Sequence, residues 1–348
     1  MAGRVAGKVA FITGAARGQG RSHAVRLAEE GADIIAVDIC RDYDTVSYPL
    51  ATEADLDDTV KAVEALDRRI VAATADVRDV AALKSVVDDG VAELGRLDIV
   101  CANAGICTVQ TWDEVTPAVW QDTLDTNLTG VWNTMVVSAP HLIAGGGGSI
   151  ICISSTAGIK GLPYLAPYVA AKHGVVGIAR TMANELASHN IRVNTVHPTG
   201  VSTPMADGLG GLEGLIGRDP NLGPIYMNTL PIESLDAREI SNAVLFLASD
   251  ESRYVTGLEF TVDAGNTIRL RGDHPRGRQG QDRGQGRWAR ARADPGRGGR
   301  RPAVIRGYRD VAPAASGLFA RWLRGSRHEQ RMVRDRRRGA AARQEAAA

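Results

Sequence analysis

Short apolar runs alternate with segments of helical spacing over most of the chain, starting near residue 7. The segment 21–30 is a helical example, with Ala24, Val25, Leu27 and Ala28 on one side. The apolar runs occupy residues 9–13, 33–38, 70–77, 97–105, 148–155, 191–198 and 258–265. Continuous rather than alternating apolar runs are typical of strands buried on both faces of a parallel sheet. Seven such strands with intervening helices predict an α/β fold with an open, doubly wound sheet.

Three segments depart from this alternation. An acidic, polar insertion at about 41–58 separates the second strand from its helix. A Gly- and Pro-rich stretch at 203–231 is too long for an ordinary connector, so we interpret it as a substrate lid loop. The chain after Leu270 is rich in arginine and glycine and offers little to bury, which predicts a disordered tail. We therefore expect one dinucleotide-binding domain at 5–268 and a basic low-complexity tail at 271–348.

The charge of the tail sets it apart from the domain. The whole chain has 348 residues and a formal net charge of +1, but residues 271–348 carry 21 arginines against 7 acidic residues, a net of +14. This charge fits an arm that binds a nucleic-acid backbone, yet the tail has no ordered aromatic interleaving and no known motif, so a nucleic-acid partner is not expected. Its abrupt start also fits a frame-shifted or read-through segment of GC-rich sequence. A chain ending at Leu270 that keeps activity and assembly would show the tail to be dispensable.

The cysteines and the N-terminus indicate the compartment. Cysteines stand at 40, 101, 107 and 152, three of them in or beside apolar runs, and no CxxC pair or zinc-ligand spacing occurs. We expect no metal site and a reduced, cytoplasmic setting. The N-terminus lacks a long apolar core of a signal peptide, and no apolar run approaches the roughly 20 residues of a membrane helix.

A glycine-rich turn follows the first strand at TGAARGQG, residues 13–20. Glycines there let the backbone approach a pyrophosphate, and the following helix start supplies amide donors. Asp38 ends the second strand about 20 residues later, where a carboxylate accepts hydrogen bonds from the ribose of NAD and repels the 2′-phosphate of NADP. Arg17 favours that phosphate instead. We weigh Asp38 above Arg17 and predict NAD.

A candidate catalytic group lies near the fifth predicted strand. Tyr168 and Lys172 are four residues apart after Pro167 and so share one face of a helix. A neighbouring ammonium favours the phenolate and lowers the pKa of a tyrosine that otherwise titrates near 10. Ser155 ends the ICISS strand, at the edge where ligands bind in open α/β sheets. Alone, the Tyr–Lys pair is typical of a solvated helix face; with Ser155 it predicts proton transfer to a substrate oxygen.

These residues, taken with ANAG at 102–105 and Asn127 in DTNLTGVW, make the chain resemble a short-chain dehydrogenase/reductase. The resemblance covers about residues 5–268. Within that family the chain is most similar to the mycofactocin-coupled, carveol-dehydrogenase-like group, through stretches such as IAVDICRDY and NTVHPTGVSTPM.

The resemblance implies roles for individual residues. Tyr168 is then the acid/base, Lys172 lowers its pKa, Ser155 orients the substrate oxygen, and Asn127 holds a water that links Lys172 to solvent. The residues that the resemblance places around the cofactor are Gly14, Arg17, Gly18, Gln19, Gly20, Asp38, Asp76, Val77, Asn103, Ala104, Gly105, Tyr168, Lys172, Val201 and Thr203. We interpret His23, His173 and His197 as structural.

The implied activity is an NAD-dependent transfer of hydride between an alcohol and a ketone. The apolar composition of 203–231 favours an apolar, terpenoid-like secondary alcohol. The resemblance further implies tightly held NAD re-oxidised by mycofactocin, and a homotetramer packed through about 116–144 and 166–188. Two alternatives remain: an NADPH-dependent 3-oxoacyl thioester ketoreductase, and an inactive dinucleotide-binding sensor.

Overall fold

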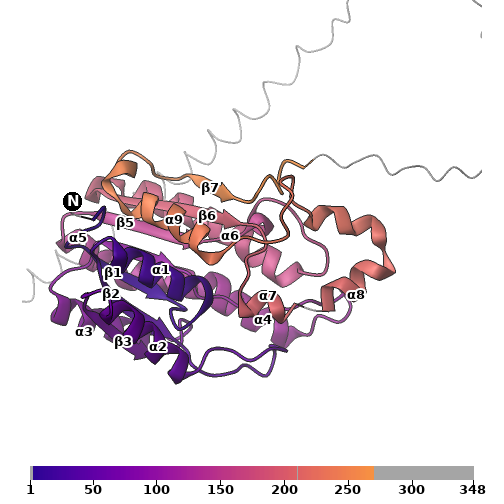
Figure 1. Ribbon diagram of the computed structural model, residues 1–348, viewed down its shortest axis with the longest axis horizontal. Helices are drawn as coiled ribbons and strands as arrows, with labels where there is room; N and C mark the ends of the chain where they lie inside the picture. Colours follow the sequence, from indigo (N-terminus) through magenta and orange to yellow (C-terminus); the bar gives the residue numbers. More distant parts are fainter. Residues whose placement is uncertain (1–2, 210, 270–348) are drawn as a thin grey trace, which may run out of the picture. The chain divides into compact units, whose positions relative to one another are not determined.

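A computed structural model of the protein describes residues 3–209 and 211–269. The predicted tail at 271–348, with its expected disorder, lies outside the described residues. The described part is a parallel sheet covered by helices on both faces (Figure 1), which confirms the predicted doubly wound α/β fold. None of its helices is long and apolar enough to cross a membrane.

Seven strands form the sheet within the described residues. In chain order they are β1 (Val9–Thr13), β2 (Asp33–Asp38), β3 (Ile70–Thr74), β4 (Ile99–Ala102), β5 (Gly148–Ile153), β6 (Ile191–Pro198) and β7 (Glu259–Val262). Their order in space is β3-β2-β1-β4-β5-β6-β7. The order reverses direction between β1 and β4, and in open α/β sheets ligands bind outside the carboxyl ends of the strands at such a switch point.

Helices alternate with the strands along the chain. They are α1 (Gly18–Glu29), α2 (Glu53–Glu64), α3 (Val80–Leu94), α4 (Pro117–Leu124), α5 (Gly130–Ala144), α6 (Ala166–Glu185), α7 (Pro204–Asp207), α8 (Gly211–Arg218) and α9 (Ala237–Ala248). Their ends follow local chemistry: Thr52 and Asp55 form a capping box at the start of α2, and Gly95, with φ near +90°, ends α3.

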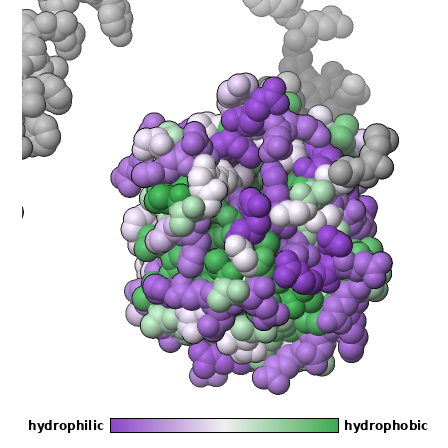
Figure 2. All heavy atoms as spheres, turned by 90° about the vertical axis from the view of Figure 1, so that its left-hand side faces the viewer, coloured by the Kyte–Doolittle hydropathy of each residue, from purple (hydrophilic) through white to green (hydrophobic). Residues whose placement is uncertain are grey.

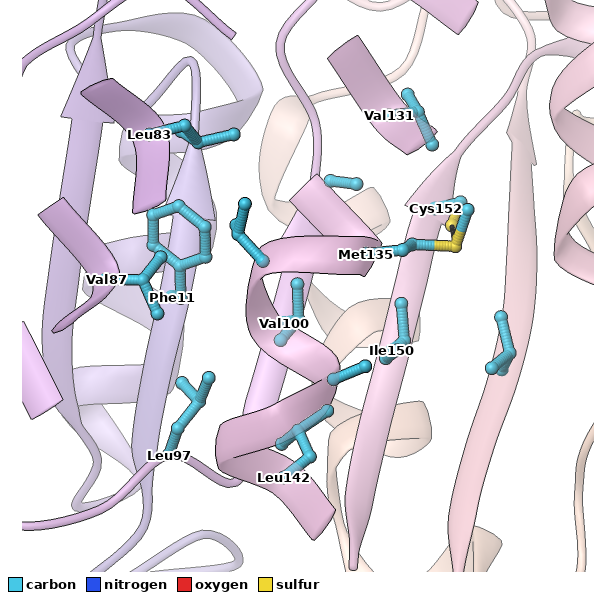
Figure 3. Close-up of a cluster of buried hydrophobic side chains, with 14 of the residues drawn as sticks. Phe11, Leu83, Val87, Leu97, Val100, Val131, Met135, Leu142, Ile150 and Cys152 are labelled. Atoms are coloured by element: carbon cyan, nitrogen blue, oxygen red, sulfur yellow. Dashed lines mark hydrogen bonds between the residues drawn. The ribbon is translucent and has the colours of Figure 1, made fainter. Parts of the chain in front are cut away.

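Two apolar clusters lie on the two faces of the sheet. One joins the sheet to α1, α2 and α9, and the other joins it to α3, α5 and α6. Figure 3 shows the second cluster, in which Phe11 and Met135 are completely buried. Burial of a side chain of this size contributes about 1.5–3 kcal/mol. Polar side chains cover most of the face in Figure 2, with apolar ones visible between them.

Two sequence expectations need correction. The edge strands β3 and β7 are only partly buried, because each has a neighbour on one side alone, whereas all strands had been expected to be buried on both faces. The 203–231 stretch is not a plain loop: it contains α7, α8 and a 3-10 turn at Pro220–Tyr226. Figure 1 shows α7 and α8 together with α4 toward one end of the sheet.

Candidate active site

A cavity of about 430 Å³ lies at the carboxyl ends of the strands. Residues that follow β1, β2, β3, β4, β5 and β6 all border it, together with the insertion after β2 and the 203–231 segment. Of the predicted site residues, all but Gly20 and Asn127 line this cavity. The fold therefore gathers residues that are up to about 190 positions apart in the sequence.

The glycine-rich turn after β1 is held against the end of β4. The Thr13 hydroxyl accepts hydrogen bonds from the backbone amides of Asn103 (3.0 Å) and Ala104 (3.1 Å). Gly14 has φ near +66°, and a Cβ there would lie 2.9 Å from the Ala104 Cα. Gly20 does not border the cavity; its Cβ would lie 1.9 Å from the Gly14 carbonyl oxygen, so glycine there permits close packing inside the turn.

Asp38 closes the cavity on the β2 side. Its side chain is buried, and its carboxylate accepts hydrogen bonds from the amides of Ala16 (3.0 Å) and Cys40 (3.3 Å). These bonds fix the carboxylate at the rim of the glycine-rich turn. A negative charge is thus built into the part of the cavity nearest the turn.

Arg17 also borders the cavity but is tied to the insertion. Its guanidinium donates a hydrogen bond to the Pro49 carbonyl, and a Cβ on the adjacent Gly18 would lie 3.5 Å from the Thr203 side chain. Val201, two residues before Thr203, forms a bridge with Leu235. The glycine-rich turn is therefore enclosed by the insertion on one side and the start of the 203–231 segment on the other.

Asp76 and Val77 follow β3 and line the far end of the cavity. Burial alone would raise the pKa of Asp76, but hydrogen bonds from the Arg78 side chain and backbone lower it overall. Arg78 also stacks on the ring of Tyr43, 4.2 Å from its centroid. This network attaches the insertion to the loop after β3.

Tyr168 and Lys172 lie one turn apart on α6, which begins at Ala166, two residues before Tyr168. The Lys172 ammonium donates a 2.8 Å hydrogen bond to the Ile153 carbonyl and lies 5.4 Å from the centre of the Tyr168 ring. Ser155 follows β5 and accepts a hydrogen bond from the Ala157 amide at 3.1 Å. The three predicted catalytic side chains that border the cavity therefore meet at the ends of β5 and α6.

Burial shifts both titratable groups of this cluster. It raises the pKa of Tyr168 above its ordinary value, while the Ser155 side chain acts in the opposite direction. It lowers the pKa of Lys172 to about 8. The protein alone thus makes the phenol a weaker acid, contrary to the lowering expected from Lys172, because desolvation makes the largest contribution to the pKa of Tyr168.

Asn127 lies inside a π-helical turn, Asp125–Thr129, that separates α4 from α5. Its side chain accepts from the Ile106 amide (2.8 Å) and donates to the Ile106 carbonyl (2.7 Å). π-helical turns of this kind are frequent at functional sites. Two of the hydrogen bonds that this side chain can make therefore hold the chain after β4.

Several residues of the site were missed at the level of sequence. Tyr43 and Tyr48 from the insertion, Cys107 after β4 and Tyr226 from the 203–231 segment all border the cavity. The signal available was position: the insertion begins directly after Asp38. His197, interpreted as structural, donates to or accepts from the Thr195 hydroxyl and lies 2.9 Å from the Ser155 carbonyl oxygen, so it fixes the backbone that carries Ser155.

Comparison with known proteins identifies the family. The sequence profile described as enoyl-(acyl carrier protein) reductase matches residues 14–267. The (-)-trans-carveol dehydrogenase of Rhodococcus erythropolis is 50% identical over 275 residues, which are 76% of this chain and 99% of that protein.

Two solved structures are similar in both sequence and fold. A short-chain dehydrogenase from Mycobacterium paratuberculosis bound to NAD is 52% identical, with a TM-score of 0.75 over 77% of this chain and 100% of that one. Carveol dehydrogenase from Mycobacterium avium in complex with NAD is 55% identical, with a TM-score of 0.73 over the same shares. The chain therefore belongs to the short-chain dehydrogenase/reductase family, in its carveol-dehydrogenase-like group.

Proposed function

We propose that the protein is an NAD-dependent oxidoreductase that transfers hydride between an apolar secondary alcohol, or the matching ketone, and NAD. One observation carries this proposal: Tyr168, Lys172 and Ser155 border the same cavity as Asp38 and the glycine-rich turn. A candidate proton-transfer group and a candidate nucleotide-binding turn thus border one cavity. The two NAD-bound relatives support the choice of cofactor.

The residues around the glycine-rich turn fit a dinucleotide. Glycine at position 14 lets the turn pack against the end of β4, because a Cβ there would lie 2.9 Å from the Ala104 Cα, and the turn borders the cavity with its backbone. The Gln19 side-chain oxygen is buried without a hydrogen-bond partner in the described residues and lines the cavity. Asp38 would hold the adenosine ribose, and Asp76 and Val77 the adenine. When bound, NAD supplies the acceptor for the hydride.

In alcohol oxidation, Tyr168 takes the hydroxyl proton while Ser155 holds the same oxygen. The phenol must be ionised to do so, and burial opposes this. Lys172 offsets part of that penalty as a cation 5.4 Å from the ring centre, although its own pKa of about 8 leaves it charged only up to mildly alkaline pH. A positive nicotinamide would add to the same effect.

The walls of the cavity support an apolar substrate. Leu162, Leu209 and Leu212 border the cavity alongside aromatic rings. Apolar side chains of this kind favour the apolar, terpenoid-like alcohol that we propose. The carveol dehydrogenase of R. erythropolis supports this choice.

The NADPH-dependent ketoreductase is the weaker alternative. Asp38 is buried with its carboxylate at the glycine-rich turn, where a 2′-phosphate would meet its charge. Arg17 is the residue that favours the phosphate, and it already donates to the Pro49 carbonyl. An inactive sensor is disfavoured because Tyr168, Lys172 and Ser155 are all present beside the cavity.

We further propose that NAD is tightly held and re-oxidised by mycofactocin, that the domain spans 5–268, and that the enzyme works in the cytoplasm without a nucleic-acid partner. These points rest on the sequence and its resemblance. A homotetramer through α4, α5 and α6 is supported by exposed apolar side chains on α4 and α5: Trp120, Trp132 and Val136. Light scattering on the full chain and on one ending at Leu270 would test the assembly.

Replacement of Tyr168 by Phe tests the proposed function. General acid–base catalysis contributes about 10²–10⁴-fold, so single-turnover NAD reduction by an apolar alcohol should fall by that factor. Cofactor affinity, measured by calorimetry, should change little, because the ring remains. A Tyr168→Phe protein with near wild-type turnover would show that the proton acceptor is another group.

A further inference from the structure

Tyr48 brings the insertion to the reacting end of the cavity. It comes from the irregular segment between β2 and α2, yet only 8% of its surface is exposed, and it borders the same cavity as Tyr168. Its hydroxyl oxygen accepts a hydrogen bond from the backbone amide of Cys107 at 3.2 Å. That amide belongs to the chain that leaves β4. The tyrosine is therefore fixed at its outer end by the main body of the fold.

The other side of Tyr48 rests on the 203–231 segment. A Cβ built on Gly208 would lie 2.3 Å from Cγ and Cδ1 of Tyr48 and 2.6 Å from its Cβ. The ring thus lies directly against the Gly208 backbone, with no space for any side chain between them. Backbone cannot move aside as a flexible side chain can, so the ring is braced from behind.

The braced ring lies within electrostatic range of the proposed acid/base. A charge on Cys107 or Tyr48 would raise the pKa of Tyr168, in addition to the larger effect of burial. Cys107 acts in the same way on Tyr226. Three tyrosines from three segments of the chain therefore surround the Cys107 region of the cavity.

We propose that Tyr48 is a specificity-determining residue, whose ring forms a rigid wall that admits compact monocyclic alcohols and excludes fused-ring ones. This inference rests on the proposed alcohol oxidation. A hydrophobic wall discriminates between substrates by excluding the larger one. One extra methylene in such a site changes the ratio of the two kcat/KM values by about 10–200-fold. A fused second ring adds several methylenes, which would have to fit against the braced phenol.

The test compares cyclohexanol with 2-decalol. Single-turnover NAD reduction is followed by NADH fluorescence, so that the result does not depend on what re-oxidises the cofactor. Binding of cyclohexanone and 2-decalone to the same holoenzymes is measured by calorimetry. The variants are Tyr48→Ala, which removes the wall, and Gly208→Ala, which pushes the ring toward the cavity. The matched control is Gly214→Ala in the same segment, where an added Cβ meets nothing within 4 Å.

Tyr48→Ala should raise the preference for decalin over cyclohexane compounds by about tenfold or more, in turnover and in binding. Gly208→Ala should lower that preference, and Gly214→Ala should leave it within twofold of wild type. Tyr48→Phe keeps the ring and should keep the wild-type preference between the two alcohols, which separates the effect of ring size from that of the lost Cys107 hydrogen bond. Turnover with an unchanged preference in Tyr48→Ala would overturn the inference and leave the proposed function standing. A shifted binding preference without any turnover would support the wall and sink the proposed chemistry.

Discussion

The two halves of the cavity, at the ends of β1–β3 and at the ends of β4–β6, are lined by different chemical groups. At the ends of β1, β2 and β3 it is made of glycine backbone and of carboxylates whose partners are amides and arginines, as at Asp38 and Asp76. At the ends of β4, β5 and β6 it is made of hydroxyl, phenol and ammonium groups, and burial displaces the pKa of the Tyr168 phenol and of the Lys172 ammonium.

The difference separates recognition from chemistry. The first half places fixed charges and amide donors with their partners already satisfied, so it suits a ligand that must only be held. In the second half, titratable groups are partly removed from water. Their pKa values there depend on neighbouring groups, and a proton can be transferred between them and a substrate. Changes in the second half should therefore alter rate and pH dependence, and changes in the first half affinity and stability.

The largest effect is expected for Lys172→Met. Loss of the cation 5.4 Å from the Tyr168 ring removes a charge that favours the phenolate, so the phenol pKa should rise further. Alcohol oxidation should fall by at least about a hundredfold at neutral pH, and its rise with increasing pH should move to more alkaline values. Stopped-flow measurement of NADH formation across pH tests this.

Lys160→Met serves as its control. Lys160 is also partly buried but donates to the carbonyls of Ile225 and Asn266 instead of facing the phenol. The variant should lose stability and keep the pH profile. An equal shift of the pH–rate profile in both variants would contradict a specific effect of Lys172 on the Tyr168 phenol.

In the half of the cavity at the ends of β1, β2 and β3, which we call the nucleotide half, Gly14→Ala should cause the largest loss of stability. Its φ near +66° disfavours alanine, and the new Cβ would lie 2.9 Å from the Ala104 Cα. Strain and overpacking together predict about 3 kcal/mol of lost stability, with weakened NAD binding. Gly7→Ala is the matched control, because Gly7 has φ near +74° with nothing within 4 Å. It should lose only about 1 kcal/mol by chemical denaturation, and equal losses would refute the close-packing role of Gly14.

The sequence predicted the nucleotide half better than the walls around it. β1, β2 and β6 begin and end where their apolar runs do, because a parallel strand buried on both faces needs a continuous run of apolar residues. The wall formed by Tyr48 could not be derived, since it depends on contact between the insertion and Gly208, about 160 residues apart. Periodicity carries no information on where two irregular segments meet. The displaced pKa of Tyr168 was missed for a related reason: the Tyr–Lys spacing shows the ammonium but not the burial that opposes it.

Asp38→Asn should have a smaller effect, confined to affinity. Asparagine keeps an oxygen for the Ala16 amide but loses the charge. A hydrogen bond to a charged group is worth about 1.5–3 kcal/mol, so NAD should bind at least about tenfold more weakly, while NADP binds relatively better. Asp33→Asn, at the opposite end of β2 and paired with Arg69, is the control and should leave both affinities unchanged. Calorimetric titration decides, and an unchanged NAD/NADP ratio would contradict the role of Asp38.

The smallest effect concerns His23, the one buried imidazole of α1. It bonds to the Ser241 hydroxyl at 2.8 Å, and burial lowers its pKa to about 3. The unfolded chain binds a proton there near pH 6.5 and the folded chain does not, so stability should fall as pH drops from 6.5 toward 3, by about 1 kcal/mol between pH 6 and pH 5. His23→Asn should flatten this slope even if it lowers stability overall, whereas the exposed His173→Asn should not. Turnover at neutral pH should stay near wild type in folded His23→Asn protein, because this buried titratable group lies outside the half of the cavity that holds Tyr168 and Lys172. A large loss of turnover would contradict the assignment of proton transfer to that half alone.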